Sequence, residues 1–242
     1  MDKNIHNLNR AGYVVYTRKG RIIIEGPDMT IIGQSNNTLW TAEGVLCSEC
    51  YGFASQDEYI VLDIGLNIGI ASLYFANNPK VAHVYGFEPF PETFMQAQVN
   101  LTNNPALAAK VTPFNFGLGT ENKEVAVHYN KDLPGSMSTI HDRFAEGELQ
   151  QVSIKSVSEV LEPIFNRHAE KVLCKMDCEG AELEILPALE ASGLLRRIDA
   201  LIMEWHYARP TALVDILERN GFTVFYDHVA MNALGFVRAV RL

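Results

Sequence analysis

The sequence predicts a doubly wound α/β fold with a mostly parallel sheet, preceded by a short β-rich extension. From residue 59 onward, apolar runs typical of buried strands alternate with stretches of helical periodicity. Four of these runs end in an acidic residue, at the edge where an open α/β sheet binds its ligands. With 242 residues, 48% of them hydrophobic, the chain can bury one full core without disulfides or metals.

Residues 1–56 are predicted to form the extension, and residues 57–242 the main domain. The extension contains three short strand patterns separated by glycine turn signals, at residues 13–17, 21–25 and 29–32. No Gly/Ser/Pro linker, internal repeat or low-complexity tract divides the chain further.

Seven strands are predicted in the main domain, the last two as an antiparallel pair that closes the sheet. They are residues 59–63, 81–87, 110–116, 172–176, 200–203, 222–226 and 236–240. One predicted helix ends at Asn77, and others begin at Pro91, Ser156, about Ala181 and Thr211. A capping box, Ser156-Val-Ser-Glu159, marks one of these starts. Residues 120–155 form a less regular insertion with strand-like segments at 125–129 and 152–155.

The charge distribution argues against nucleic acid as a partner. Lys and Arg number 20 against 29 Asp and Glu, and basic residues nowhere cluster with interleaved aromatic residues. The first ten residues are polar, and no run approaches about 18 consecutive apolar residues. These features predict a cytoplasmic protein that binds a small molecule and no membrane, while the oligomeric state is not predicted.

The four cysteines raise the alternative of a four-thiolate zinc site. They lie in a C-x2-C pair, Cys47 and Cys50, and a C-x3-C pair, Cys174 and Cys178. Cys174 lies inside an apolar strand pattern and Cys178 follows its end, so their side chains need not converge. Reduced, mostly buried thiols are the favoured interpretation.

The turn after the first predicted strand has the composition of a nucleotide-binding loop. In Asp63-Ile-Gly65-Leu-Asn67-Ile-Gly69 the glycines permit close approach of a ligand, and the following helix directs its N-terminus at an anion. Glu88 ends the next strand, 19 positions after Gly69, where a carboxylate can accept both hydroxyls of a ribose. A tight turn without a ligand is the alternative interpretation.

S-adenosylmethionine (SAM) suits this loop better than a dinucleotide. Asn67 replaces the middle glycine of the G-x-G-x-x-G pattern that a pyrophosphate requires. The ammonium group of SAM would pair with Asp63, and its carboxylate would meet the loop. An NAD-type oxidoreductase is therefore the second hypothesis, further disfavoured by the absence of a Tyr-x-x-x-Lys pair.

Four segments together resemble the FkbM family of methyltransferases, over residues 59–206. They are D-I-G-x-N-I-G from Asp63, V-Y-G-F-E-P-F-P-E-T-F around Glu88, K-M-D-C-E-G-A-E from Lys175, and I-M-E-W-H ending at His206. The third is the most specific. Leu66 and Cys178 depart from the residues usual in the family, but both changes leave the polar positions intact.

The resemblance implies a class I methyltransferase with a seven-stranded Rossmann-like sheet, which commonly methylates hydroxyl groups of sugars or natural products. It also implies which residues contact SAM, namely Asp63, Gly65, Asn67, Gly69 and Glu88, with Asn115, Phe116 and Gly117 near the adenine. A non-catalytic domain that retains the fold is a third hypothesis, and an N-methyl acceptor stays open.

A hydroxyl acceptor needs a group that removes its proton, and strand-end acids are the candidates. Asp177 ends the strand expected beside the cofactor-binding strand, although it could instead cap the next helix. Glu179 is a candidate substrate contact, whereas Glu182 is interpreted as structural. Glu204 and His206, two positions apart on an extended segment, share a face and could hold or deprotonate the acceptor.

Three further features are left open by the sequence. Asp177 and Glu204 could bind one Mg²⁺ that holds a diol acceptor, but no clear third ligand is evident. Lys175 is expected to point outward, or else to pair with a neighbouring acid. The Pro134-Gly-Ser-Met-Ser138 segment, with His141 and Arg143 nearby, could form a substrate loop or a plain surface loop.

Overall fold

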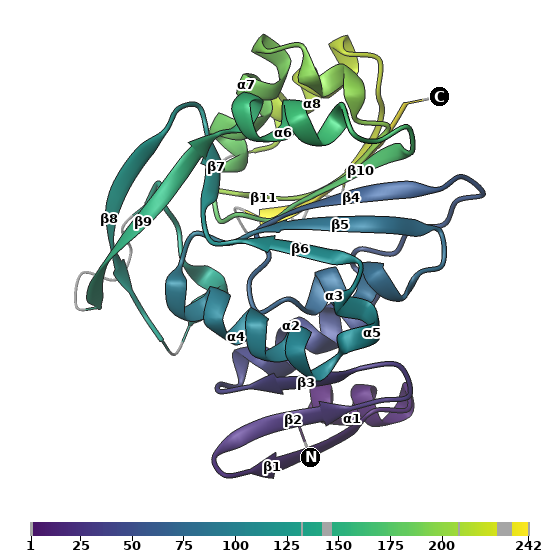
Figure 1. Cartoon of the computed structure of the whole chain (residues 1–242), viewed down its shortest axis with the longest axis vertical. Coiled ribbons are helices and arrows are strands. Elements are labelled where there is room, and N and C mark those ends of the chain that lie inside the picture. The colour runs from purple at the N-terminus through teal and green to yellow at the C-terminus, as the bar shows by residue number, and fades with distance from the viewer. Residues whose placement is uncertain (1, 132, 142–146, 208, 227–233, 242) are drawn as a thin grey trace.

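A seven-stranded sheet forms the centre of the molecule (Figure 1). The structure is a computed structural model that describes residues 2–131, 133–141, 147–207, 209–226 and 234–241. In spatial order the strands are β12 (Thr223–Tyr226), β13 (Leu234–Val240), β11 (Ala200–His206), β10 (Lys171–Met176), β4 (Tyr59–Ile64), β5 (Val81–Phe87) and β6 (Val111–Phe114). Only β13 opposes its neighbours; β11, β10, β4, β5 and β6 pair in parallel. The predicted doubly wound, mostly parallel sheet and its closing antiparallel pair are confirmed.

The strand order reverses between β4 and β10. From β4 the chain proceeds to β5 and β6 on one side, and later returns to place β10 and β11 on the other. The crevice at the carboxyl ends of the two strands that flank such a reversal is the usual ligand site of this architecture. The register pairs Asp63 with Lys175 at this point, so their side chains lie beside each other.

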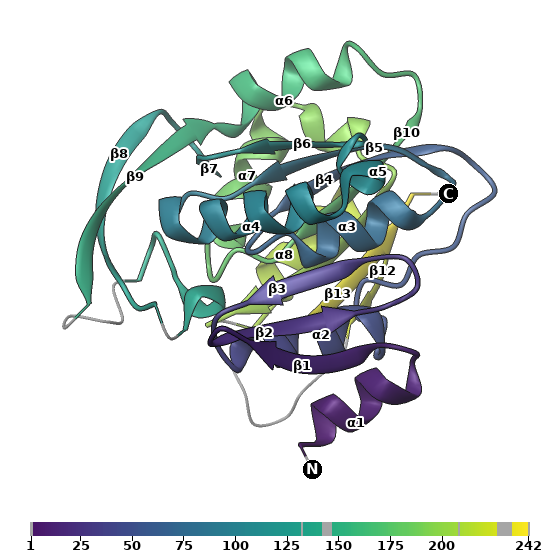
Figure 2. The ribbon, with the colours of Figure 1, turned by 60° about the horizontal axis from the view of Figure 1, so that its bottom comes forward.

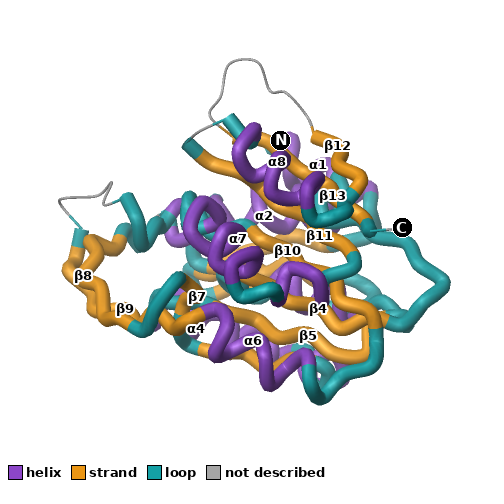
Figure 3. Tube along the Cα trace, turned by 90° about the horizontal axis from the view of Figure 1, so that it is seen from above, coloured by secondary structure: helices purple, strands orange, loops and turns teal. Residues whose placement is uncertain are grey.

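Helices cover both faces of the sheet, as Figures 1 and 3 show. On one face lie α6 (Val157–Phe165), α7 (Glu182–Ala191) and α8 (Thr211–Arg219); on the other lie α2 (Asn37–Leu46), α3 (Ile70–Asn77), α4 (Pro91–Asn103) and α5 (Pro105–Ala108). Strand β4 is buried throughout because Ile60 and Leu62 pack toward the first group while Val61 packs toward the second. A continuous apolar run in the sequence therefore becomes a central strand.

The N-terminal part forms a third layer below α3 and α4 (Figure 2). Helix α1 (Lys3–Arg10) precedes an antiparallel sheet of β1 (Val14–Arg18), β2 (Arg21–Glu25) and β3 (Thr30–Gly33). The three strands agree with the prediction, whereas α1 and α2 were not predicted; α1 is largely polar and buries only Leu8. Asn100 of α4 and Asn104, the residue that follows this helix, accept hydrogen bonds from β3 backbone amides at 2.8 Å. The boundary at residue 56 stays a prediction, since this layer shares an apolar cluster with the central sheet.

A second small sheet stands at the carboxyl edge of the central sheet. Strands β8 (Lys123–Tyr129) and β9 (Glu148–Ser156) form a hairpin, and β9 also pairs with β7 (Gly117–Gly119). The short 3-10 helix η1 (Pro134–Ser136) lies in the connection between β8 and β9, and a second, η2 (Leu194–Arg197), follows α7. The irregular insertion expected from the sequence is thus the hairpin that flanks the ligand edge in Figure 1.

The predicted capping box does not form, although α6 does begin after Ser156. Ser156 Oγ lies 3.0 Å from Ser158 Oγ, and Glu159 accepts a hydrogen bond from Asn122 at 2.9 Å. Asn122 Oδ1 also accepts from the Ser156 amide at 2.9 Å. A residue from the insertion therefore satisfies the helix start, and local spacing alone could not reveal it.

Strand β11 extends to His206, three residues beyond the prediction, while β6 ends at Phe114 and leaves Asn115 and Phe116 in a turn. Among the described residues, no helix is both long and apolar enough to cross a membrane.

Candidate active site

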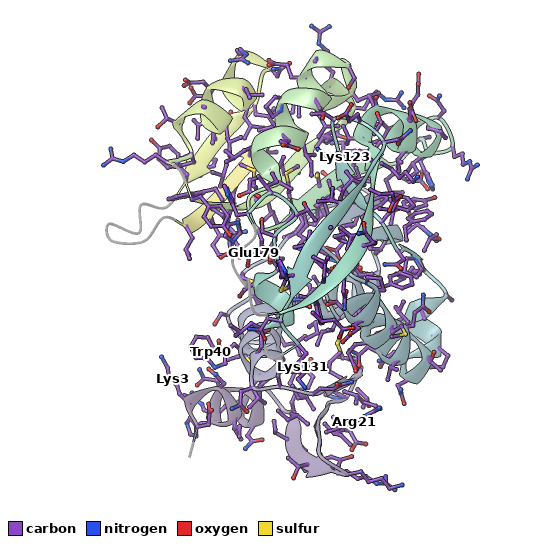
Figure 4. All side chains as sticks on the ribbon, turned by 90° about the vertical axis from the view of Figure 1, so that its left-hand side faces the viewer. Lys3, Arg21, Trp40, Lys123, Lys131 and Glu179 are labelled. Atoms are coloured by element: carbon purple, nitrogen blue, oxygen red, sulfur yellow. The ribbon has the colours of Figure 1, made fainter. Side chains whose placement is uncertain are left out.

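A cleft opens at the carboxyl edge, beside the reversal between β4 and β10. Its walls include the loop after β4, the end of β5, the start of β7, the segment after η1 and the turn after β10. Six of the twelve predicted site residues line it: Gly65, Asn67, Glu88, Gly117, Asp177 and Glu179. The other six, Asp63, Gly69, Asn115, Phe116, Glu204 and His206, do not. Figure 4 views this side of the molecule, with Glu179 labelled near the centre.

The loop after β4 is fixed by backbone constraints. Gly65 has φ +88°, and a Cβ at this position would lie 1.8 Å from the carbonyl oxygen of Asp177. No other residue fits there, because the loop and the turn after β10 are in direct contact. The amides of Gly65 and Leu66 donate to the Phe87 carbonyl at 3.1 and 2.9 Å. These bonds hold the loop against the end of β5.

Glu88 is held by backbone donors at the end of β5. Its Oε2 accepts from the Asn67 amide at 2.9 Å, and its Oε1 accepts from the Phe90 amide at 3.0 Å. Burial raises the pKa of Glu88 to about 7, although these two hydrogen bonds act in the opposite direction. Each carboxylate oxygen keeps a second lone pair for a ligand. Asn115 does not line the cleft but donates to the Glu88 carbonyl at 2.9 Å.

Asp63 and Lys175 form a buried ion pair beneath the loop. Lys175 Nζ lies 2.9 Å from Asp63 Oδ1 and donates to the Gly65 carbonyl at 2.6 Å, while Ser72 donates to Asp63 Oδ2 at 2.6 Å. Asp63 has no exposed surface and Lys175 only 2%. Burial disfavours the charged form of Lys175, but the negative charge of Asp63 favours it, and the pKa of Lys175 lies above its usual value.

This ion pair bears on two of the expectations from the sequence. Lys175 does not point outward, although its pairing with a neighbouring acid is confirmed. Direct pairing of Asp63 with a ligand ammonium stays a prediction; in this structure its oxygens contact Lys175 and Ser72, and Asp63 is not among the residues that line the cleft. Through Lys175, Asp63 supports the loop.

Asp177, Glu204 and His206 converge next to the cleft, as the sequence predicted. One ligand atom from each lies within 4.8 Å of the others. Asp177 does not cap α7, whose N-cap is Ala181, so that alternative is wrong. Its Oδ2 instead accepts a hydrogen bond from Tyr51 at 2.6 Å. Tyr51 was not predicted: no local pattern links it to a residue 126 positions away.

Glu182 fixes His206, one member of this cluster, through hydrogen bonds. It is fully buried and accepts from the His206 amide at 2.7 Å, from His206 Nδ1 at 3.1 Å and from the Gly180 amide at 2.9 Å. These bonds agree with the structural role expected for Glu182. They also orient the imidazole, so that His206 Nε2 lies 3.8 Å from Glu179 Oε2.

The concentration of negative charge alters the protonation of the cluster. Burial and the neighbouring Asp177 raise the pKa of Glu204 to about 8. Burial disfavours a charged His206, but the hydrogen bond to Glu182 and the charges of Asp177 and Glu179 raise the pKa of His206 to about 9. At neutral pH Glu204 is therefore mainly a neutral acid and His206 a cation.

The cluster also bears on the metal alternatives. His206 supplies the third ligand atom that the sequence did not identify for Asp177 and Glu204. An imidazole in the set suits Mg²⁺ less well than oxygen ligands alone would. The four cysteines are free, and Cys174 packs on the opposite face of the sheet from Cys47 and Cys50, which is unlike a four-thiolate zinc site.

The η1 helix and the segment after it reach the same site. Gly135, Met137 and Thr139 line the cleft, and Ser138 Oγ donates to the Glu179 carbonyl at 2.6 Å. The His141 ring packs against Tyr207, with 4.5 Å between centroids. These contacts make the predicted loop part of the site, while Arg143 lies outside the described residues.

The model of the methyltransferase FkbM domain matches residues 63–224. The chain belongs to this family. Methyltransferase sdnD of Sordaria araneosa is 27% identical over 212 residues, covering 76% of this chain and 81% of that protein. The hexuronic acid methyltransferase AglP of Haloferax volcanii is 26% identical over 154 residues, covering 63% of this chain and 58% of that protein.

A solved FkbM-family structure supports the fold. The crystal structure of methyltransferase FkbM from Methylobacillus flagellatus KT gives a TM-score of 0.53 at 16% identity. The superposition covers 84% of this chain and 53% of that one, so this chain spans about half the length of that relative. The Rossmann-like methyltransferase architecture expected from the sequence is confirmed.

Proposed function

We propose that this FkbM-family protein is a SAM-dependent O-methyltransferase acting on a hydroxyl group of a small molecule, such as a sugar or natural product. The observation that carries the proposal is Glu88, which lines the cleft and is fixed by two backbone donors, as a ribose-binding carboxylate would be. The family match supports methyl transfer, and the hexuronic acid methyltransferase among the relatives supports a sugar acceptor.

In this proposal each wall of the cleft has a distinct task. Glu88 and Asn67 bind the nucleoside end, with Gly65 giving close backbone approach and Gly117 bordering the adenine. SAM supplies an activated methyl group, so the protein mainly aligns the acceptor and excludes water. The segment with Gly135 and Met137 lines the cleft and contributes to that exclusion. Glu179 contacts the acceptor.

Asp177 is the proposed proton acceptor. It lines the cleft, whereas Glu204 and His206 do not, although one ligand atom of each lies within 4.8 Å of Asp177. At neutral pH Glu204 is mainly protonated and His206 carries a positive charge, so neither is the proposed base; the charge of His206 offsets that of Asp177. Among the described residues, Tyr51 alone donates a hydrogen bond to the Asp177 carboxylate, and only to Oδ2. The Oδ1 atom is left for the hydroxyl proton.

Calorimetric titration with S-adenosylhomocysteine tests the cofactor assignment. We expect micromolar binding, and no binding of NAD in a parallel titration. Binding of NAD alone would favour the oxidoreductase hypothesis, and binding of neither would favour a domain that retains the fold without the chemistry.

The affinity for S-adenosylhomocysteine is expected to rise with pH between 6 and 8. Ionised Glu88 can accept two ribose hydroxyls while keeping its backbone bonds, whereas a protonated carboxyl loses one acceptor site. Because the pKa of Glu88 is about 7, affinity should fall up to about tenfold per pH unit below that value. Titrations at several pH values would show this slope in the wild type and a flat profile in Glu88→Gln. A flat wild-type profile would remove Glu88 from ribose binding.

Transfer of tritiated methyl groups from SAM to a panel of sugars, uronic acids and a cellular metabolite extract tests the acceptor class. Label in an ether linkage would support O-methylation, and label on nitrogen would contradict it. The assay repeated with a chelator tests the Mg²⁺ alternative: transfer that is lost and then restored by Mg²⁺ would assign Asp177 and Glu204 to the ion.

A further inference from the structure

Tyr51 links the N-terminal part of the chain to the candidate active site. It lies before the family match, which starts at residue 63, yet its hydroxyl is 2.6 Å from Asp177 Oδ2. The side chain is 5% exposed. Its ring packs against Phe75 of α3 and edge-on against Phe236 of β13, with centroid separations of 6.4 and 6.1 Å. Two elements of the main domain therefore fix the ring.

The surroundings of Tyr51 also fix the direction of this hydrogen bond. Burial and the charge of Asp177 raise the pKa of Tyr51 well above its usual value, so the phenol stays protonated and must donate. The Lys175 ammonium lies 5.3 Å from the centre of the Tyr51 ring, within the range of a cation–π contact. Tyr51 thus contacts the Lys175 ammonium, which also donates to the Gly65 carbonyl and so supports the loop after β4.

We propose that Tyr51 is a positioning residue that holds Oδ2 of Asp177 and thereby directs Oδ1 at the acceptor hydroxyl. The inference rests on the proposed function of Asp177. The Asp177 backbone is tied to β4 through its amide, which donates to the Ile64 carbonyl at 3.0 Å. The carboxylate itself can still rotate about its terminal bond, and the Tyr51 hydroxyl removes this freedom. Residues outside the matched domain would then complete the catalytic geometry.

Tyr51→Phe tests the proposal because it keeps the packed ring and removes only the hydroxyl. Tritiated SAM with the metabolite extract as acceptor serves as the assay. We expect the maximal rate to fall roughly 10- to 100-fold, with the KM for SAM and the affinity for S-adenosylhomocysteine unchanged. Tyr74→Phe is the matched control, since Tyr74 also packs against Phe75 but its hydroxyl has no hydrogen bond within the described part of the chain. A wild-type rate in Tyr51→Phe would overturn the proposal.

The double variant Tyr51→Phe/Asp177→Asn separates positioning from a general effect on folding. If Tyr51 acts through Asp177, the double variant is no slower than Asp177→Asn alone, whereas independent effects would multiply. A second cycle, which needs no acceptor, uses the urea midpoints of the wild type, Tyr51→Phe, Asp177→Ala and Tyr51→Phe/Asp177→Ala, because alanine removes the acceptor of the Tyr51 hydrogen bond. Coupled midpoints support the contact, and additive midpoints contradict the proposal. Unaltered activity in Asp177→Asn would instead refute the proposed function. The urea cycle would still test the contact between Tyr51 and Asp177.

Discussion

Asp177→Asn is expected to lower kcat by about 10²- to 10⁴-fold, the range that loss of a positioned general base produces. The amide has nearly the same shape and can still accept the Tyr51 hydrogen bond, but it cannot take up the acceptor proton. Binding of S-adenosylhomocysteine should persist, because Glu88 and the loop after β4 are unchanged. Methyl transfer from tritiated SAM and calorimetry measure the two quantities separately.

Asp215→Asn provides the control for this experiment. Asp215 lies on the exposed side of α8, away from the cleft, so the same chemical change should leave kcat unaltered. Unaltered turnover in Asp177→Asn would remove Asp177 as the proton acceptor. Loss of S-adenosylhomocysteine binding would show that Asp177 helps to form the cofactor site.

The fold could be predicted from sequence wherever local pattern and tertiary environment agree. The run at residues 59–64 is apolar on both sides because helices cover both faces of the sheet, and it is β4. The polar helix α1 gave no such signal, because it buries only Leu8. At Ser156 the sequence identified the helix start but not the partner, since Asn122 comes from a distant insertion.

The candidate site shows the same difference between what local sequence pattern reveals and what depends on tertiary contacts. Strand-end position alone brings Asp177, Glu204 and His206 together, since parallel strands end at one edge of a sheet. Which groups are buried, paired or exposed depends on packing across strands. The sequence therefore did not reveal that Asp63 forms a buried pair with Lys175, and it gave no signal for Tyr51.

Lys175→Met should lower the free energy of unfolding by about 3–5 kcal/mol, the usual cost of removing one partner of a buried ion pair. The substitution leaves the Asp63 carboxylate without its countercharge at a site with no exposed surface. It also removes the donor to the Gly65 carbonyl, so the loop after β4 should bind S-adenosylhomocysteine more weakly. Since a domain of this kind is stable by only about 5–15 kcal/mol, urea denaturation would show a large shift of the midpoint.

A second lysine on strand β10 provides the control for this experiment. Lys171, at the other end of the strand, lies 2.7 Å from Asp57, but both side chains are about half exposed, at 48% and 54%. Lys171→Met makes the same chemical change where water solvates the remaining carboxylate, and should hardly move the midpoint. Asp63→Asn added to Lys175→Met removes the orphaned charge and should restore much of the lost stability. Equal midpoints for Lys175→Met and Lys171→Met would mean that water reaches Asp63, and that the buried pair does not support the loop as the geometry indicates.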